Sequence, residues 1–469
     1  MYIEQLYTGC LAEAAYYIES QGEAAIIDPL RETAPYLELA ASRGARIRYV
    51  METHFHADFV SGHLDLARKS GAQIVFGPLA RPNYEAYVAT DGEDLPLGNI
   101  RIRVLHTPGH TMESSTFLLI DEQGREHAIF TGDTLFIGDV GRPDLAVKSD
   151  LTREDLAGHL YDSLYNKILP LSDEVIVYPG HGAGSACGKM MSSETIDTLG
   201  NQKRLNYALQ PMSREAFVQA VTDGLVAPPQ YFPKNAVLNR MGYESVDEVM
   251  DRGITALDVE TFAQLAQEQQ ALIIDTRSTE DFPQGFVPGS WFIGIDGSFA
   301  PWLGALVSDL KQPILLVADP HRVEEVVTRM ARVGYDNALG YLDGGIAAWR
   351  AAGKPVDTFA EIDATDLEAL YEGPERPMLL DVRKCSEYNS EHIDGARNLP
   401  LDFIHERVAP FDPGMTYYVH CAGGYRSLVA ASILRGLGFD SLINVRGGYK
   451  ALVRTALPRT EYVAPVTMP

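Results

Sequence analysis

The chain is poor in cysteine. Its 469 residues include four cysteines, Cys10, Cys187, Cys385 and Cys421, and no two of them form a CxxC pair. This spacing argues against a zinc ribbon and against a disulfide framework. It is typical of a protein from a reducing compartment, in which thiols stay free.

Long apolar runs are also missing, although 46% of the residues are hydrophobic. No stretch approaches the ~20 consecutive apolar residues of a membrane-spanning helix. The first residues, Met1 to Glu4, lack the basic residues and apolar core of an export signal. We therefore expect a soluble, cytoplasmic protein with no membrane partner.

Positive charge is scarce, because 39 Lys and Arg residues face 64 Asp and Glu residues, for a net charge of -25. Such a field repels polyanions and argues against nucleic-acid binding. An anionic small substrate would need local Arg, Lys or backbone N–H groups to hold it. Whether the chain forms a homo-oligomer is left open by the sequence.

The length predicts about three domains at about 150 residues each. We expect a first domain at residues 1–245, a second at 255–355 and a third at 362–462. The proline-rich stretch at 227–233 breaks regular structure and marks the exit from the first domain.

Histidines and an aspartate are crowded into residues 53–63, which include His54, His56 and Asp58. The apolar residues 47–51 before them predict a buried strand, and residues 64–69 after them predict a helix. The loop therefore follows a strand end, where α/β proteins usually build their sites. The pattern predicts a metal-binding loop, and the alternative is a polar surface loop.

Further candidate ligands recur downstream, each directly after a predicted strand. They are His110 after residues 100–105, Asp133 after residues 128–130, and His181 after residues 175–177. Imidazole and carboxylate ligands that recur at strand ends favour a metal site over a surface loop.

The last two domains are predicted to be copies of one another. An apolar strand that ends in Asp-x-Arg occurs at Asp275 and Arg277 and again at Asp381 and Arg383. Further matched segments keep an offset of roughly a hundred residues, which is the size of a domain rather than of a solenoid repeat. Strands that alternate with helices predict parallel sheets with helices on both faces.

The second copy carries a reactive-cysteine loop, which runs from Cys421 through Ala422, Gly423, Gly424 and Tyr425 to Arg426. It lies between a predicted strand and a helix at residues 428–437. The glycines allow N–H groups to point at the sulfur, and the helix adds its positive end. Both effects stabilise a thiolate or persulfide, and Arg426 can hold an anion. The alternative is a buried structural cysteine.

The first copy has lost this loop. Asp319, Pro320, His321 and Arg322 occupy its place, without a cysteine or a glycine pair. A persulfide cannot form there, so we expect an inactive copy.

The first half of the chain, by its four ligand motifs, resembles the metallo-β-lactamase superfamily. The resemblance implies an αββα sandwich that binds one or two metal ions at the sheet edge. Two-metal members commonly have a histidine directly after the motif aspartate, where this chain has Phe59. A phenyl ring cannot coordinate, which favours a single metal site.

Within that superfamily the chain most resembles persulfide dioxygenases. The resemblance implies a mononuclear non-haem Fe(II) on His54, His110 and Asp133, a set that leaves positions open for O₂ and a substrate sulfur. His56, Asp58 and His181 would then orient ligands and bound water. The implied reaction oxidises a low-molecular-weight thiol persulfide, such as glutathione persulfide, to sulfite. Zinc is a competing metal.

The two C-terminal copies resemble rhodanese sulfurtransferases, and the domain order resembles bacterial persulfide dioxygenase–rhodanese fusions. The resemblance implies a Cys421 persulfide formed with help from Arg426, with the loop residues 422–425 binding substrate. If sulfite accepts the sulfur the product is thiosulfate, and if a thiol accepts it the domain supplies substrate to the iron. The sequence does not choose the direction.

Two residues close to the metal motifs are ambiguous. Arg142 either pairs with an acid or holds an anionic substrate, and Cys187 either contacts substrate or is a packed thiol. Two rival functions also remain. One is a glyoxalase II-like thioesterase that uses metal-bound hydroxide, and the other is a sulfide-responsive scaffold with degenerate domains.

Overall fold

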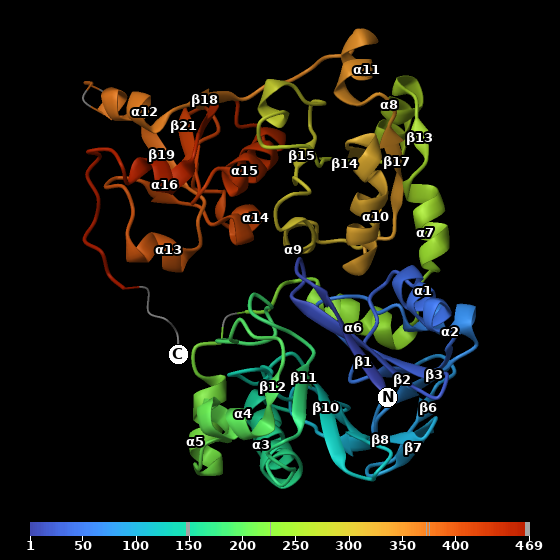
Figure 1. The fold of residues 1–469 in the computed structure, drawn as a ribbon. Helices are drawn as coiled ribbons and strands as arrows, with labels where there is room; N and C mark the ends of the chain where they lie inside the picture. The colour runs from blue at the N-terminus through green and yellow to red at the C-terminus, as the bar shows by residue number, and fades with distance from the viewer. Residues whose placement is uncertain (147–150, 226, 372, 375, 465–469) are drawn as a thin grey trace. The chain divides into compact units, whose positions relative to one another are not determined.

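The computed structural model describes residues 1–146, 151–225, 227–371, 373–374 and 376–464. The chain divides into two compact units, the first built mainly from residues 1–248 and the second mainly from the residues after them. Each unit has its own sheets and its own hydrophobic cores (Figure 1). No helix within these ranges is long and apolar enough to cross a membrane.

The first unit contains two six-stranded mixed sheets. In spatial order the first sheet consists of β1 (Tyr2–Thr8), β2 (Glu13–Ser20), β3 (Glu23–Ile27), β4 (Arg46–Glu52), β5 (Gln73–Phe76) and β6 (Tyr87–Val88). The second consists of β12 (Asp197–Thr198), β11 (Ile176–Pro179), β10 (Glu126–Gly132), β9 (Ser115–Ile120), β8 (Ile100–His106) and β7 (Asp94–Leu97). The strands that we predicted before the ligand motifs are β4, β8, β10 and β11.

The two sheets pack face to face, and helices cover their outer faces. Alternate residues of β2 show why: Tyr16 lies in the core between the sheets, and Tyr17 lies in the core under the helices. Both faces of the strand are therefore buried, which explains its nearly continuous apolar sequence. This arrangement is an αββα sandwich and confirms the predicted fold.

The helices of this unit form two groups and an extension. Those on the first sheet are α1 (Ala34–Arg43) and α2 (His63–Ser70). Those of the second group are α3 (Arg153–Ser163), which continues as the π-helix η1 (Leu164–Ile168), α4 (Leu199–Leu205), η2 (Tyr207–Leu209) and α5 (Arg214–Thr222). The extension consists of α6 (Phe232–Met241) and the start of α7 (Val246–Gly253). The proline-rich stretch before Phe232 therefore ends the sandwich but not the unit.

The second unit contains two five-stranded parallel sheets with the same strand order. The first is β13 (Ala256–Leu257), β17 (Ala338–Leu342), β16 (Ile314–Val317), β14 (Leu272–Asp275) and β15 (Trp291–Phe292). The second is β18 (Ala360–Ile362), β22 (Leu442–Val445), β21 (Tyr417–His420), β19 (Met378–Asp381) and β20 (Arg397–Asn398). The identical order confirms the predicted duplication and the predicted parallel sheets.

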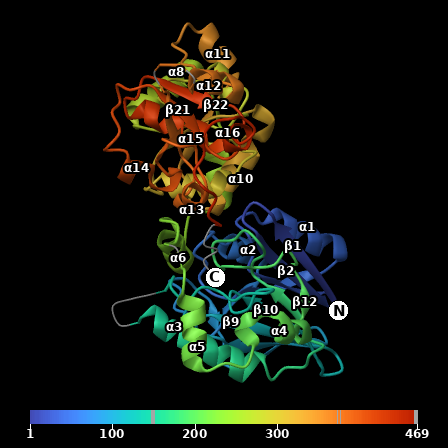
Figure 2. The same cartoon turned by 90° about the vertical axis from the view of Figure 1, so that its left-hand side faces the viewer.

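Helices surround both sheets of this unit. They are α8 (Val259–Glu268), η3 (Phe282–Gln284), α9 (Phe299–Leu306), η4 (Pro320–Arg322), α10 (Val323–Arg332) and α11 (Gly345–Ala351) in the first repeat. In the second they are α12 (Ala364–Tyr371), α13 (Cys385–Ser390), η5 (Leu401–Phe403), α14 (Ile404–Arg407), α15 (Tyr425–Gly436) and α16 (Gly448–Leu452). Helix α15 packs on β21 and β22 (Figure 2).

The Asp-x-Arg motif has the same role in both repeats. Nε of Arg277 and of Arg383 lies 2.9 Å and 3.0 Å from Oδ1 of the aspartate two positions earlier. Each guanidinium also donates to a backbone carbonyl in the next loop, that of Gly285 or Glu391. The motif therefore fastens a loop to the end of a buried strand in both repeats, including the one without a cysteine loop.

Candidate metal centre and sulfur-transfer loop

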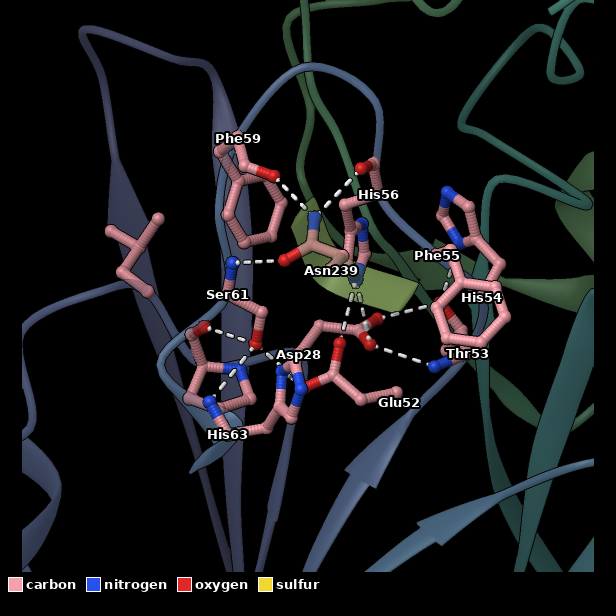
Figure 3. A network of polar contacts seen from close by, with 12 residues as sticks. Asp28, Glu52, Thr53, His54, Phe55, His56, Phe59, Ser61, His63 and Asn239 are labelled. Atoms are coloured by element: carbon pink, nitrogen blue, oxygen red, sulfur yellow. Dashed lines mark hydrogen bonds and ion pairs between the residues drawn. The ribbon is translucent and has the colours of Figure 1, made fainter. Parts of the chain in front are cut away.

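The loop at residues 53–63 connects β4 to α2, and Asp28 at the end of β3 orients its first histidine. The Asp28 carboxylate accepts hydrogen bonds from Thr53 N and Oγ1, both at 2.8 Å. Thr53 Oγ1 lies 2.9 Å from Nδ1 of His54 (Figure 3). A contact at Nδ1 leaves Nε2 as the ring nitrogen that can bind a metal.

Three buried side chains from separate strand ends converge beyond His54 Nε2. The candidate ligand atoms of His54, His110 and Asp133 all lie within 4.8 Å of one another. Nε2 of His110 is 3.3 Å from Asp133 Oδ2, and its Nδ1 is 2.9 Å from the Arg142 carbonyl oxygen. Gly132 allows this approach, because a Cβ there would lie 2.4 Å from Thr53 Oγ1.

These residues fit a divalent metal ion. Both carboxylate oxygens of Asp133 are buried and have no hydrogen-bond partner among the described residues. Burial, together with the nearby His56, His110 and His181, lowers the pKa of His54 well below its usual value, so its ring is neutral. A buried carboxylate without a hydrogen-bond partner needs a compensating cation, and two nitrogens with one oxygen suit Fe(II) or Zn²⁺.

A second buried group lies against the first and includes Cys187. The candidate ligand atoms of Asp58, His181 and Cys187 lie within 4.8 Å of one another. His181 Nε2 lies 3.4 Å from Asp58 Oδ2 and 3.5 Å from Asp133 Oδ1, so Asp133 of the first group contacts the second. Burial, with Asp58 and Asp133 nearby, raises the pKa of the Cys187 thiol well above its usual value.

His56 contacts a different set of side chains. Its Nε2 lies 3.0 Å from Asp28 Oδ1 and 3.4 Å from Glu52 Oε2 (Figure 3). Burial disfavours the imidazolium, but the two carboxylates outweigh burial and raise the pKa of His56 well above its usual value. Phe59 packs against this ring at an interplanar angle of 31°, with centroids 4.3 Å apart. His56 and Phe59 therefore stabilise the loop at residues 53–63 through contacts outside the His54, His110 and Asp133 cluster.

Arg142 shows the first of its two predicted alternatives. Its guanidinium pairs with Asp144 through two contacts, Nε to Oδ1 at 2.7 Å and Nη2 to Oδ2 at 2.8 Å. Its backbone carbonyl contacts His110, as noted above, and its N–H donates to the Cys187 carbonyl oxygen at 3.0 Å. The residue thus connects a candidate ligand to the segment that carries Cys187.

Asn239 on α6 is a site residue that the sequence did not indicate. Its Nδ2 donates to the carbonyl oxygens of His56 and Phe59, both at 2.7 Å, and its Oδ1 accepts from Ser61 N at 2.9 Å (Figure 3). One buried amide thus satisfies three backbone groups of the metal loop. An isolated asparagine so far along the chain gives no sequence signal.

The Cys421 loop is held by glycines of two segments. Gly424 N donates to Cys421 Sγ at 3.1 Å, and Gly424 has a φ of 110°. Because of that turn, α15 begins at Tyr425, three residues before the predicted start. Gly448 packs beneath the loop, since a Cβ there would lie 2.4 Å from the Cys421 carbonyl oxygen. Cys421 itself is buried, while Gly423 is exposed.

Arg426 forms an ion pair at the start of α15. Its Nη1 and Nη2 donate to the Glu387 carboxylate at 2.7 Å and 2.9 Å. Glu387 raises the pKa of the Arg426 guanidinium although burial acts in the opposite direction. Helix α13, which carries Glu387, is therefore attached to the loop.

In the first repeat a short 3₁₀ helix, η4, replaces the loop. Asp319 caps it by accepting from His321 N at 2.9 Å, and Arg322 pairs with Asp296 and Glu325. This segment offers no thiol that could take up a sulfur atom.

Fold and site together define the class of protein: a metallo-β-lactamase-type domain with a buried His and Asp cluster, followed by two rhodanese-like domains. Family comparisons agree. Residues 8–181 match the metallo-beta-lactamase superfamily, and residues 258–352 and 363–455 each match the rhodanese-like domain.

Individual relatives identify the family within this superfamily. Human mitochondrial persulfide dioxygenase ETHE1 is 31% identical over 210 residues, which are 44% of this chain and 74% of the human protein. A crystal structure described as a metallo-beta-lactamase from Staphylococcus aureus is 33% identical, with a TM-score of 0.63 over 73% of this chain and 98% of that one. The chain belongs to the persulfide dioxygenase family of the metallo-β-lactamase superfamily and is fused to tandem rhodanese domains.

A probable hydroxyacylglutathione hydrolase of Schizosaccharomyces pombe is similar as well. It is 31% identical over 181 residues, which are 38% of this chain and 66% of the yeast protein.

Replacing Asn239 by alanine should weaken metal binding. The change leaves buried N–H and carbonyl groups of the metal loop unpaired, at a cost of about 1–3 kcal/mol for each group. We expect a lower metal content after dialysis against a chelator and a lower unfolding midpoint. Asn201→Ala on α4 is the control, and an unchanged metal content in Asn239→Ala would contradict the assigned role.

Proposed function

We propose that the first unit is a mononuclear non-haem Fe(II) persulfide dioxygenase. It converts a low-molecular-weight thiol persulfide such as glutathione persulfide, with O₂ and water, to the thiol, sulfite and two protons. The convergence of His54, His110 and Asp133 carries this proposal, because these residues form a set of two imidazoles and one carboxylate. Fe(II) held by them would supply O₂ chemistry in one-electron steps.

The surrounding residues orient the centre and the substrate. Asp58 and His181, which adjoin Asp133, would hold bound water or the substrate persulfide, and His56 would fix the loop through Asp28 and Glu52. Cys187 would contact the substrate sulfur from its place beside Asp58 and His181. Arg142 would act on an anionic substrate only by leaving Asp144.

The third domain would be the sulfurtransferase of this protein. The Cys421 thiolate attacks the outer sulfur of a donor persulfide, so that a Cys421 persulfide forms and the donor thiol leaves. An acceptor then takes that sulfur and regenerates the thiolate. With sulfite as acceptor the product is thiosulfate. The substrate would bind to Ala422, Gly423, Gly424 and the Tyr425 backbone, with Arg426 beside them.

The proposal also covers the boundaries and the location of the protein. We assign the dioxygenase to residues 1–245, the inactive repeat to 255–355 and the sulfurtransferase to 362–462. The free thiols favour a reducing cytoplasm, in which glutathione keeps cysteines reduced.

The decisive measurement is O₂ consumption by anaerobically purified, Fe(II)-loaded protein mixed with glutathione persulfide. We expect uptake that depends on both iron and persulfide, with sulfite and thiosulfate as products. No uptake, together with bound zinc and cleavage of a glutathione thioester, would support the hydrolase instead. A thioesterase needs no oxygen.

Asp133→Ala should abolish iron binding and O₂ consumption, since Asp133 lies within reach of both imidazoles. Sulfur transfer at Cys421 should survive, because the second unit has its own cores. Iron analysis and the two assays test this expectation. Asp121→Ala, a buried aspartate in the turn that follows β9, is the control, and loss of both activities would show that the two units depend on one another.

Cys421→Ser should abolish sulfur transfer while iron stays bound. A hydroxyl is far less nucleophilic than a thiolate and cannot form a persulfide. The ratio of sulfite to thiosulfate, compared with the wild type, would then give the direction of transfer. Cys385→Ser should retain full activity, and transfer that survives in Cys421→Ser would assign the reaction to another thiol.

A further inference from the structure

The inactive repeat packs directly on the helix that follows the Cys421 loop. Within the second unit, β15 of the first repeat contacts α15 of the second (Figure 1). Phe292 N donates to Ser432 Oγ at 2.9 Å, and both groups are buried. Hydrogen bonds of this kind fix the position of the helix relative to the inactive repeat.

Tyr425, the first residue of α15, inserts its side chain into that repeat. Its hydroxyl donates to the Gly294 carbonyl oxygen at 2.9 Å, and its ring lies 5.7 Å from the Phe292 ring. Burial raises the pKa of Tyr425, so the hydroxyl keeps the proton that it donates.

Gly297 provides the space for this ring. A Cβ at position 297 would lie 2.4 Å from two Tyr425 ring atoms, whereas the Gly297 backbone is outside the left-handed region that requires glycine. Its lack of a side chain is therefore needed for Tyr425 rather than for the turn itself.

Tyr425 lies between two residues of the Cys421 loop, Gly424 and Arg426. Gly424, before it, donates its N–H to Cys421 Sγ, and Arg426, after it, carries the cation of the loop. The tyrosine side chain is fixed at its hydroxyl and its ring, and this restrains the backbone that connects both groups. A displacement of about 1 Å at a reacting group can lower a rate by up to about a hundredfold.

We propose that the inactive repeat positions the Cys421 loop through Tyr425, which fits against Gly294 and Gly297. Tyr425 is a positioning residue in this proposal, which rests on the proposed sulfurtransferase function of the third domain. The repeat has no cysteine of its own at this loop, but it holds the Cys421 loop in position.

Three substitutions in the full-length protein test the proposal. Gly297→Ala removes the space for the ring, Tyr425→Phe removes only the hydroxyl, and Tyr425→Ala removes the ring. We expect Gly297→Ala to lower kcat for sulfur transfer about tenfold with a smaller change in KM. We expect the pH midpoint of Cys421 alkylation to rise, because Gly424 N–H no longer points at the sulfur. Tyr425→Phe should show a smaller effect in the same direction.

The double variant Gly297→Ala with Tyr425→Ala separates positioning from general destabilisation. Without the ring, the added methyl group has nothing to displace, so the two effects should not add. Gly436→Ala is the matched control: it lies on α15 against the same repeat, and its Cβ would be 3.8 Å from Trp291 Nε1. O₂ uptake by the first unit should stay at the wild-type level in all of these variants.

Additive effects in the double variant, or an unchanged kcat and alkylation midpoint in Gly297→Ala, would overturn the proposal. A wild-type protein that transfers no sulfur would instead overturn the sulfurtransferase function. The alkylation midpoint distinguishes the two failures, because it reports on the Cys421 environment without requiring turnover.

Discussion

The structure of the first unit depends on the burial of the Asp133 carboxylate. This side chain ends a central strand of one sheet and meets imidazoles from both sheets. An uncompensated buried carboxylate is unstable, so this cluster favours a bound cation. The Thr53 and Asn239 contacts described above hold the loop in the geometry that such a cation requires.

The two repeats of the second unit share the requirements of a stable sheet, but only the second repeat must also form the cysteine loop. Both repeats keep the strand order and the Asp-x-Arg pairing that stabilise the sheet. The second repeat keeps the cysteine loop, whose glycines permit a tight turn around the sulfur. The first repeat lacks that loop, and its Gly297 instead makes room for the Tyr425 side chain of its neighbour.

Much of the fold was predictable because its signals are local. Apolar strands followed by polar loops located β4, β8, β10 and β11, and the matched Asp-x-Arg motifs revealed the duplication. The start of α15 was misplaced by three residues, because the left-handed conformation of Gly424 ends the loop earlier than the helical pattern suggests. Asn239 gave no signal, because a single asparagine has no spacing that can be recognised.

The sequence by itself determined the order of the elements, the candidate ligand types at the strand ends and the single complete cysteine loop. These features follow from residue type and short-range spacing. Only the tertiary structure decided which side chains meet. It directed His56 to Asp28 and Glu52, placed Cys187 beside Asp58 and His181, and enclosed Tyr425 in the first rhodanese-like repeat. Such contacts join residues far apart along the chain, so packing rather than local pattern sets them.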